Sequence, residues 1–413
     1  MPKTLYICYF GLREPLVQTQ VIPYLLEIMK DEIEVSLLTF EPDLKNTWTS
    51  DQIETKRREL RASGIGWHHL VYHKRPSVPA TLYDVLNGAR LIRKLIRKDG
   101  FDVLHCRVHV PALMAAIARK FSRKKPKIIF DIRGFFPEEY TDAGIWPKNG
   151  WIYRSVKRVE KWLLNESDGF VVLTAKARDI LFPESAATGF DKRGRPVEVI
   201  PCCVDLARFD GADKASRMNV RRELSVDDRF VIAYVGSFGG WYLSEEMFDL
   251  FGEARTLDTS VFALILKQRQ PELAAEALRA KGFGDGDFFV GSVSPAEIPR
   301  YLNAADAAIS FIKKCYSKQA SSPTKNAEYL ASGLPMIANS GIGDTDSLIR
   351  EDGVGVLVDG FQPSNLQAAI RQLKALGDVS GKCRESARAR FDMKTVGGPR
   401  YRRLYQKLLQ PLR

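Results

Sequence analysis

The chain has 413 residues, 45% of them hydrophobic and 27% charged, which is close to the globular average and excludes the disordered, collagen-like and coiled-coil classes. Its 62 Lys and Arg against 50 Asp and Glu leave a net charge of +12, which indicates an anionic partner such as nucleic acid, membrane lipid or a phosphorylated substrate. No apolar run approaches the roughly 18 residues of a membrane span. The N-terminal residues do not resemble a signal peptide, and the six cysteines show no C-x-x-C spacing. We therefore expect a cytoplasmic protein without a zinc site or a disulfide framework.

Short β-branched runs alternate with helical stretches along the whole chain, which predicts parallel sheets built from βαβ units. In the first half the predicted strands are 4–10, 34–40, 103–106, 127–131, 170–173 and 197–200. After a polar stretch at 210–228 the pattern restarts, with predicted strands at 230–235, 262–266, 288–290, 307–311, 336–338 and 355–358. The fold class is therefore α/β, with two Rossmann-like, doubly wound domains whose crevices face each other. We expect domains at 1–206 and 207–392, and an amphipathic helix within 393–413 that crosses back to the first domain.

A basic helix is predicted at 83–98, where the apolar residues share one arc and the rest of the surface is cationic. Its basic residues are Arg90, Arg93, Lys94, Arg97 and Lys98, and a second basic run follows at 119–125. The helix either packs on its sheet with a solvated basic face or binds an anionic membrane surface peripherally. Nucleic-acid binding is not expected, because the basic stretches lack interleaved aromatic residues.

Three loops of the first half hold candidate site residues. The turn after the first strand carries Gly11 and leads to Gln18, which could face a sugar. The segment after 127–131 carries Arg133 and Glu138; an arginine can hold a phosphate and a carboxylate can polarise a hydroxyl, although a loop salt bridge is an equal alternative. His109 follows the strand at 103–106 and is either a structural hydrogen-bonding residue or a catalytic one.

Two loops of the second half suit a phosphate ligand. Gly236 and Ser237 belong to a glycine-rich turn directly after a predicted strand, which either lets backbone approach a phosphate closely or is an ordinary turn. Further along, Ser322 is predicted to cap a helix that has Pro323 at its first position. Lys325 lies one turn into this helix and Glu328 three residues later, so they either bind a phosphate and a ribose or form an intrahelical ion pair. The Asp-x-Asp sequence at 285–287 fits a turn better than a metal site.

These motifs resemble the bacterial glycosyltransferases of family 4, which have two Rossmann-like domains facing a central cleft in the GT-B arrangement. The resemblance rests on 16–21, 131–134, the segment Val199 to Phe209, and Pro323 to Pro335, in which Glu328 and the following Leu-Ala-Ser-Gly match the core of the family's donor motif. It departs from the family where a second glutamate is usual, here Ala320, where a cation follows the glycine turn, here Trp241-Tyr242, and where Arg133 replaces a histidine.

The resemblance implies a retaining, metal-independent hexosyltransferase that needs no cofactor and moves a sugar from a nucleotide sugar to an acceptor hydroxyl. The saccharide or lipid-linked acceptor would belong to cell-surface polysaccharide or glycolipid synthesis, at the inner face of the membrane. Glu328 would bind the ribose, and Gly236, Ser237, Ser322, Thr324, Lys325 and Lys267 would surround the diphosphate. Arg133, His109 and Glu138 would form the catalytic side, with Gly11 and Gln18 contacting the acceptor or the sugar. Two alternatives stay open: a nucleotide-sugar 2-epimerase of the same architecture, and a non-enzymatic basic binding protein.

Overall fold

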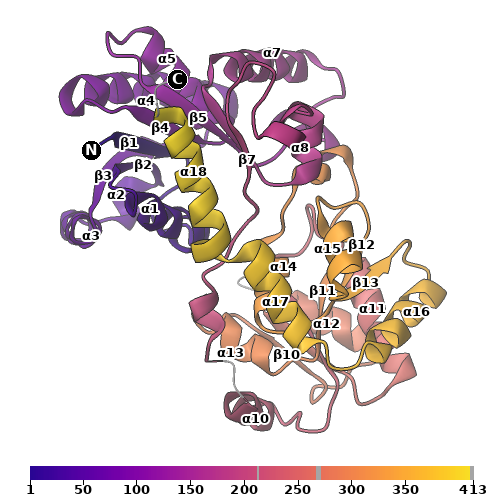
Figure 1. Cartoon of the computed structure of the whole chain (residues 1–413). Helices are drawn as coiled ribbons and strands as arrows, with labels where there is room; N and C mark the ends of the chain where they lie inside the picture. The colour runs from indigo at the N-terminus through magenta and orange to yellow at the C-terminus, as the bar shows by residue number, and fades with distance from the viewer. Residues whose placement is uncertain (212–213, 267–270, 410–413) are drawn as a thin grey trace. The chain divides into compact units, whose positions relative to one another are not determined.

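The structure is a computed structural model, and it describes residues 1–211, 214–266 and 271–409 (Figure 1). The chain forms two compact units, the first made of residues 1–201 and 397–413 and the second of residues 202–396. The sequence placed these boundaries after residues 206 and 392. The difference arises because Val204 exchanges backbone hydrogen bonds with Phe391 and Met393, which ties both connecting segments to the second unit.

The first unit is built on a parallel sheet of seven strands in the order β3-β2-β1-β4-β5-β6-β7. The strands are β1 (Lys3–Cys8), β2 (Glu34–Pro42), β3 (Ile65–Tyr72), β4 (Val103–Arg107), β5 (Lys127–Ile132), β6 (Gly169–Val172) and β7 (Val197–Val199). Six of them were predicted, and β3 was missed. This edge strand is only half-buried over most of its length and carries a glycine and two histidines, so it lacks the apolar run by which its neighbours were recognised.

Ten helices within the described residues accompany this sheet. They are α1 (Ile22–Met29), α2 (Leu44–Thr47), α3 (Ser50–Ala62), α4 (Ser77–Asp99), α5 (His109–Lys120), α6 (Phe136–Asp142), α7 (Trp151–Glu166), α8 (Ala175–Leu181), α9 (Ser185–Thr188) and α18 (Gly398–Leu409), and a short π-helix, η1 (Val17–Val21), precedes α1. The predicted basic helix is the second part of α4, which ends where Gly100 adopts φ +70°. Such a left-handed glycine is a common way to end a helix.

The last helix, α18, packs on the first unit although more than 200 residues separate it from β1, β4 and β6 (Figure 1). Besides Gly398, its buried residues are Tyr401, Leu404, Tyr405 and Leu408, all four of which were predicted to form its apolar face. Leu404 and Leu408 pack closely against Gly169 of β6: a Cβ added there would lie 3.1 Å from Leu408 and 3.3 Å from Leu404. The Tyr405 hydroxyl hydrogen-bonds with Thr4 Oγ1 at 2.9 Å and with His105 Nδ1 at 3.0 Å. The apolar stripe and these polar contacts together fix α18 against β1, β4 and β6.

The second unit repeats the design with a parallel sheet of six strands in the order β10-β9-β8-β11-β12-β13. All six strands were predicted: β8 (Val231–Val235), β9 (Phe262–Leu266), β10 (Phe288–Gly291), β11 (Ala307–Ser310), β12 (Met336–Asn339) and β13 (Gly355–Val358). The helices are α10 (Lys214–Glu223), α11 (Ser244–Leu257), α12 (Pro271–Ala280), α13 (Ile298–Asn303), α14 (Thr324–Ala331), α15 (Thr345–Asp352), α16 (Pro363–Ala375) and α17 (Ser380–Phe391). In each sheet the strand order reverses beside the unit's first strand, and ligands of such sheets bind beyond the carboxyl ends at this point.

Both faces of the second sheet are buried. Alternate residues of β8 belong to two separate apolar clusters, with Val231, Ala233 and Val235 in one and Ile232 and Tyr234 in the other. A parallel sheet covered on both faces needs strands that are apolar throughout, which is why the sequence reveals these strands so clearly. Throughout the described ranges, no helix has the length and apolar character required to cross a membrane.

Candidate active site

The loop between β11 and α14 carries the predicted donor motif, and the helix begins one residue later than expected. Pro323, with φ −66° and ψ 119°, is the N-cap of α14, and no side chain caps the helix. Ser322 is not the cap, because its Oγ accepts a hydrogen bond from the backbone N–H of Cys202 at 3.1 Å. Ser322 and Thr324 are both half-buried at the start of the helix. Ser322 therefore links the donor loop to the segment that begins the second unit.

Lys325 is a buried lysine whose ammonium group faces aromatic rings. The residue is 7% exposed, and its Nζ makes no hydrogen bond within the described part of the chain. Nζ lies 4.4 Å from the centre of the Tyr234 ring and 4.3 Å from that of Tyr242. Burial lowers the pKa of Lys325 from 10.5 to about 7. The intrahelical ion pair with Glu328, one of the two interpretations of the sequence, is wrong, because Glu328 has another partner.

That partner is Arg208, whose Nη1 lies 3.7 Å from Glu328 Oε1. The Glu328 side chain is 13% exposed; burial raises the pKa of its carboxyl group, and Arg208 acts in the opposite direction. Arg208 also donates to the Pro295 carbonyl at 2.7 Å, which holds the guanidinium in place. Arg208 belongs to the segment from Val199 to Phe209, but the sequence analysis assigned it no role. No local pattern indicates that this arginine contacts a glutamate 120 positions away.

The glycine-rich turn after β8 lies beside Lys325. Gly236 has φ +140°, a conformation that glycine adopts without strain. A Cβ at this position would stand 3.8 Å from Lys325 Nζ and 3.5 Å from the Tyr234 hydroxyl, which itself donates to the Ser237 carbonyl at 2.6 Å. The structure thus brings together two loops that the sequence proposed separately, and leaves the Ser237 side chain exposed at their edge.

Trp241 and Tyr242 occupy the place where the family usually has a cation. The ammonium group of a lysine lies against the ring of each. Lys318 Nζ lies 3.9 Å from the centre of the Trp241 ring, and Lys325 Nζ faces Tyr242. The positive charge beside this turn therefore belongs to Lys318 and Lys325, which follow β11, and not to a residue of the turn itself. Lys267, the other cation that the sequence analysis offered, lies outside the described residues.

In the first unit, His109 and Glu138 belong to one network of hydrogen bonds and ion pairs. His109 Nε2 lies 2.9 Å from Glu160 Oε2, and Lys157 pairs with both Glu160 and Glu138, the latter at 3.0 Å. Tyr153 donates to Glu138 Oε1 at 2.9 Å. Burial raises the pKa of Glu160, but the hydrogen bonds and charges of His109 and Lys157 outweigh it, so the pKa of this carboxyl group is lowered. Glu160 thus orients the imidazole of His109, a role that sequence reasoning did not assign.

Arg133, the third expected catalytic residue, belongs to a different cluster. Its Nη2 donates to Gln20 Oε1 at 3.1 Å, and its Nη1 lies 3.6 Å from Asp131 Oδ1. Gly11 and Gln18 belong to neither of these two clusters. A Cβ on Gly11 would clash with Pro42 at 2.7 Å, which explains the glycine by local packing, and Gln18 donates to the Leu12 carbonyl at 2.6 Å.

The Asp-x-Asp sequence forms no metal cluster. Asp287 bonds to Arg229 and Arg255, each at 2.6 Å, and Asp285 pairs with Arg279 at the surface. Within the described residues no group of three or more His, Cys, Asp or Glu side chains is arranged to hold a metal ion.

Family models match both halves of the chain: "Glycosyltransferase Family 4" over residues 27–208 and "Glycosyl transferases group 1" over residues 217–390. The chain belongs to the family 4 glycosyltransferases. No curated protein sequence matches it. Among solved structures, a glycosyltransferase from Rickettsia africae ESF-5 is similar with a TM-score of 0.71 and 14% identity, covering 100% of this chain and 99% of the other.

Two further structures share this GT-B fold. HepE from Anabaena, solved with UDP and glucose, has a TM-score of 0.66 and 14% identity over 98% of this chain and 100% of its own. WaaG, a glycosyltransferase involved in lipopolysaccharide biosynthesis, has a TM-score of 0.63 and 12% identity over 96% and 98%. The prediction of a two-domain GT-B glycosyltransferase is confirmed, and this protein is a glycosyl-transferring enzyme.

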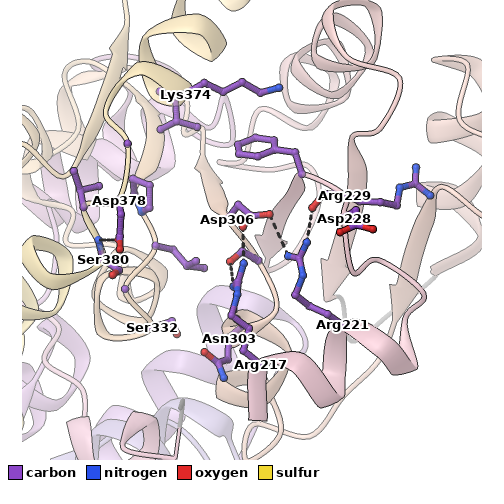
Figure 2. A pocket seen from close by; sticks show the side chains of 18 of the residues that line it. Arg217, Arg221, Asp228, Arg229, Asn303, Asp306, Ser332, Lys374, Asp378 and Ser380 are labelled. Atoms are coloured by element: carbon purple, nitrogen blue, oxygen red, sulfur yellow. Dashed lines mark hydrogen bonds and ion pairs between the residues drawn. The ribbon is translucent and has the colours of Figure 1, made fainter. Parts of the chain in front are cut away.

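The glycosyltransferase has a further large pocket, of about 1010 Å³, at the opposite, amino ends of β8, β11 and β12 (Figure 2). Arg217 and Arg221 point from α10 toward Asp306, which lies 2.5 Å from the former and 3.2 Å from the latter. Arg221 also donates to the carbonyls of Ala304 at 2.8 Å and Val226 at 2.7 Å. These cations are already engaged by protein atoms, so they fasten α10 to the sheet.

Proposed function

We propose that this glycosyltransferase is a retaining, metal-independent hexosyltransferase that uses a nucleoside diphosphate sugar as donor. The observation that carries the proposal is the buried ammonium group of Lys325, which has no hydrogen-bond partner among the described residues and lies beside the Gly236 turn. A buried cation without a counter-ion is costly, and a diphosphate would supply the missing negative charge. HepE of Anabaena, whose fold is similar, has been solved with UDP and with UDP-glucose.

The donor would lie along the first two turns of α14. Lys325 and the positive end of the helix dipole at the start of α14 favour the diphosphate. The Glu328 carboxylate, held by Arg208, would accept hydrogen bonds from the ribose hydroxyls one turn further on. When the sugar bond breaks, negative charge develops on the leaving diphosphate, and a preorganised cation in a dry site stabilises this charge.

The same residues support the proposed metal independence. Lys325, with Lys318 on the neighbouring aromatic ring, would provide the positive charge that a divalent cation provides elsewhere. Activity should therefore persist in EDTA. Retention of configuration is tested by NMR, from the anomeric coupling constant of the first product formed.

On the acceptor side, His109 is the proposed proton-transferring group, because Glu160 holds its Nε2. Its Nδ1 is buried and has no hydrogen-bond partner within the described ranges. A histidine oriented by a carboxylate is a common general base. Glu138 acts through Lys157 as a positioning residue, and Arg133 would contribute positive charge.

The test is thermal stabilisation by UDP, GDP, ADP and CMP. One nucleotide at about 100 times its Kd should add roughly 2.7 kcal/mol to the free energy of unfolding, which shifts the melting temperature by several degrees. The shift should disappear in Glu328→Ala and persist in Glu276→Ala, an exposed glutamate on α12. A shift that survives Glu328→Ala would refute the assignment of the ribose site. Conversion of the donor into an epimer without an acceptor would instead identify the enzyme as an epimerase.

We also propose that the acceptor is a membrane-associated saccharide or glycolipid, because α4 presents a surface suited to an anionic bilayer. Near its start, Val78, Leu82, Tyr83 and Leu86 are exposed apolar residues, with exposed fractions of 41% or more. Toward its end the exposed residues are Arg90, Arg93, Lys94, Arg97 and Lys98. Apolar side chains can enter the headgroup region while basic ones pair with anionic lipids.

A further inference from the structure

A cluster of buried charged groups at the carboxyl edge of the first sheet contains Arg107, Arg133 and Asp131. Arg107 is the last residue of β4 and is paired in register with Cys8 of β1 and Asp131 of β5. Arg107 Nη2 and Arg133 Nη2 each donate to the same acceptor, Gln20 Oε1, at 3.1 Å. Two guanidinium groups therefore converge on one amide oxygen, which is neutral and cannot balance their charge.

Asp131 is the carboxylate of this cluster, and it is shared among several donors. Its Oδ1 lies 3.6 Å from Arg133 Nη1, and its Oδ2 accepts a hydrogen bond from the Tyr401 hydroxyl at 2.9 Å. Burial would raise the pKa of Asp131, but Arg133, His105 and Arg107 lower it to about 2, so the group is ionised. Burial lowers the pKa of His105, which is therefore neutral near pH 7. Asp131 therefore offsets part of the positive charge of Arg107 and Arg133.

Arg107 contains a buried donor that has no acceptor within the described part of the chain. The residue is 3% exposed, and the donor is its Nη1. A buried donor without an acceptor is costly. Its position is the edge at which open parallel sheets bind ligands, and the side chain of Arg133 next to it is 7% exposed.

We propose that Arg107 and Arg133 bind an oxyanion, a carboxylate or a phosphate ester, carried by the saccharide that this enzyme handles. A guanidinium group binds a carboxylate or phosphate through two parallel hydrogen bonds, so the unsatisfied Nη1 of Arg107 is suited to such a group. The inference deepens the proposed function, on which it rests, by assigning an acidic or phosphorylated sugar as the substrate class. Its residues belong to the first unit, whereas the proposed diphosphate site belongs to the second.

The experiment is calorimetric titration of the full-length protein, at constant ionic strength, with glucuronate, glucose 6-phosphate and neutral glucose. At least one charged sugar should bind tenfold or more tightly than glucose, which corresponds to about 1.4 kcal/mol. Tighter binding of glucuronate identifies a carboxylate and tighter binding of glucose 6-phosphate a phosphate ester. Equal affinity for the charged and neutral sugars would overturn the proposal.

Variants show whether these arginines are responsible. Arg107→Gln and Arg133→Gln should each weaken binding of the charged sugar at least tenfold, whereas Arg58→Gln, an exposed arginine on α3, should not. If Arg107→Gln does not fold, Arg107→Lys keeps the charge but loses the paired donors, and binding should still weaken. Unchanged affinity in the folded variants of both positions would refute the assignment.

UDP titration of the same proteins separates this inference from the proposed donor site. Arginine-dependent binding of a charged sugar without any UDP binding would leave the oxyanion site standing and count against the donor assignment. UDP binding without discrimination between charged and neutral sugars would support the donor assignment and count against the oxyanion site.

Discussion

At the scale of single residues, the burial of Lys325 lowers the free energy of unfolding, and the same group is proposed to bind the ligand. Its pKa falls from 10.5 to about 7 on folding, so between these pH values the unfolded chain binds a proton that the folded chain does not. The second unit should therefore become more stable as pH rises from 7 toward 10. Lys325→Met should remove this dependence and stabilise the protein at pH 6 by about 1–2 kcal/mol, because no buried charge remains.

Urea denaturation of both proteins at several pH values measures this difference. Lys382→Met, at an exposed position on α17, is the control and should retain the pH dependence of the wild type. Parallel pH profiles for wild type and Lys325→Met would show that Lys325 is not titrated in this range.

The same lysine should make nucleotide binding depend on pH in the opposite direction. A diphosphate is held by the protonated ammonium group, so the affinity for UDP should decrease as pH rises from 6 to 9. The decrease should be absent in Lys325→Met, which should bind at least tenfold more weakly at pH 6. Calorimetry in two buffers of different ionisation enthalpy would also detect proton uptake on binding near pH 8. Binding without proton uptake and without pH dependence would contradict this role.

At the scale of secondary-structure elements, α10 is fastened to the second sheet mainly by charge. Asp306 bonds to Arg217 and Arg221 and accepts the Val231 backbone N–H at 2.8 Å. Asp306→Ala leaves two partly buried guanidinium groups without their carboxylate and should lower the free energy of unfolding by about 2 kcal/mol. Chemical denaturation measures the loss. Asp228→Ala, in the wall of the same pocket but exposed, should change little; equal losses would show that Asp306 has no special role.

The attachment of α18, in contrast, depends on apolar packing. Leu404 is fully buried, and Leu404→Ala should destabilise the first unit by about 2–4 kcal/mol through the cavity it leaves. Gln406→Ala, on the exposed face of the same helix, should be close to neutral. Calorimetry should assign the loss to the transition of the first unit. A loss below about 1 kcal/mol would mean that α18 contributes little to its stability.

The elements most accurately predicted were those whose sequence pattern is local. Twelve of the thirteen strands in the described ranges were recognised because buried parallel strands are apolar throughout, and α18 because its apolar residues follow the helical period. The contacts of the donor site could not be obtained in this way. Spacing along α14 left open whether Lys325 and Glu328 pair with each other or bind a ligand, and it did not reveal their neighbours Tyr234, Tyr242 and Arg208. Such partners meet only after the sheet has formed, and no periodicity encodes them.

At the scale of the whole molecule, the net charge of +12 should direct the enzyme to anionic bilayers through α4. Vesicles of phosphatidylglycerol should sediment the protein at low salt and release it at high salt, whereas phosphatidylcholine vesicles should not bind it. Arg93→Glu/Arg97→Glu should weaken binding at least tenfold, since each basic residue near the surface contributes about 1 kcal/mol. Arg58→Glu/Arg61→Glu on α3 makes the same change of charge elsewhere. If both pairs of substitutions weaken vesicle binding equally, the protein is attracted to the bilayer by its net charge and not through α4.

The placement of α18 also affects how the protein is made. All seven strands of the first sheet have been synthesised once residue 199 is added, but the helix that packs against β6 and bonds to Thr4, His105 and Asp131 starts at Gly398. At typical elongation rates of about 5–20 residues per second, the ribosome needs about 10–40 s to reach it. During that interval the nascent first unit exposes an apolar strip and several unbonded polar groups. The second unit can complete its folding first, because its last residue precedes α18. The unit that is translated first therefore finishes folding last.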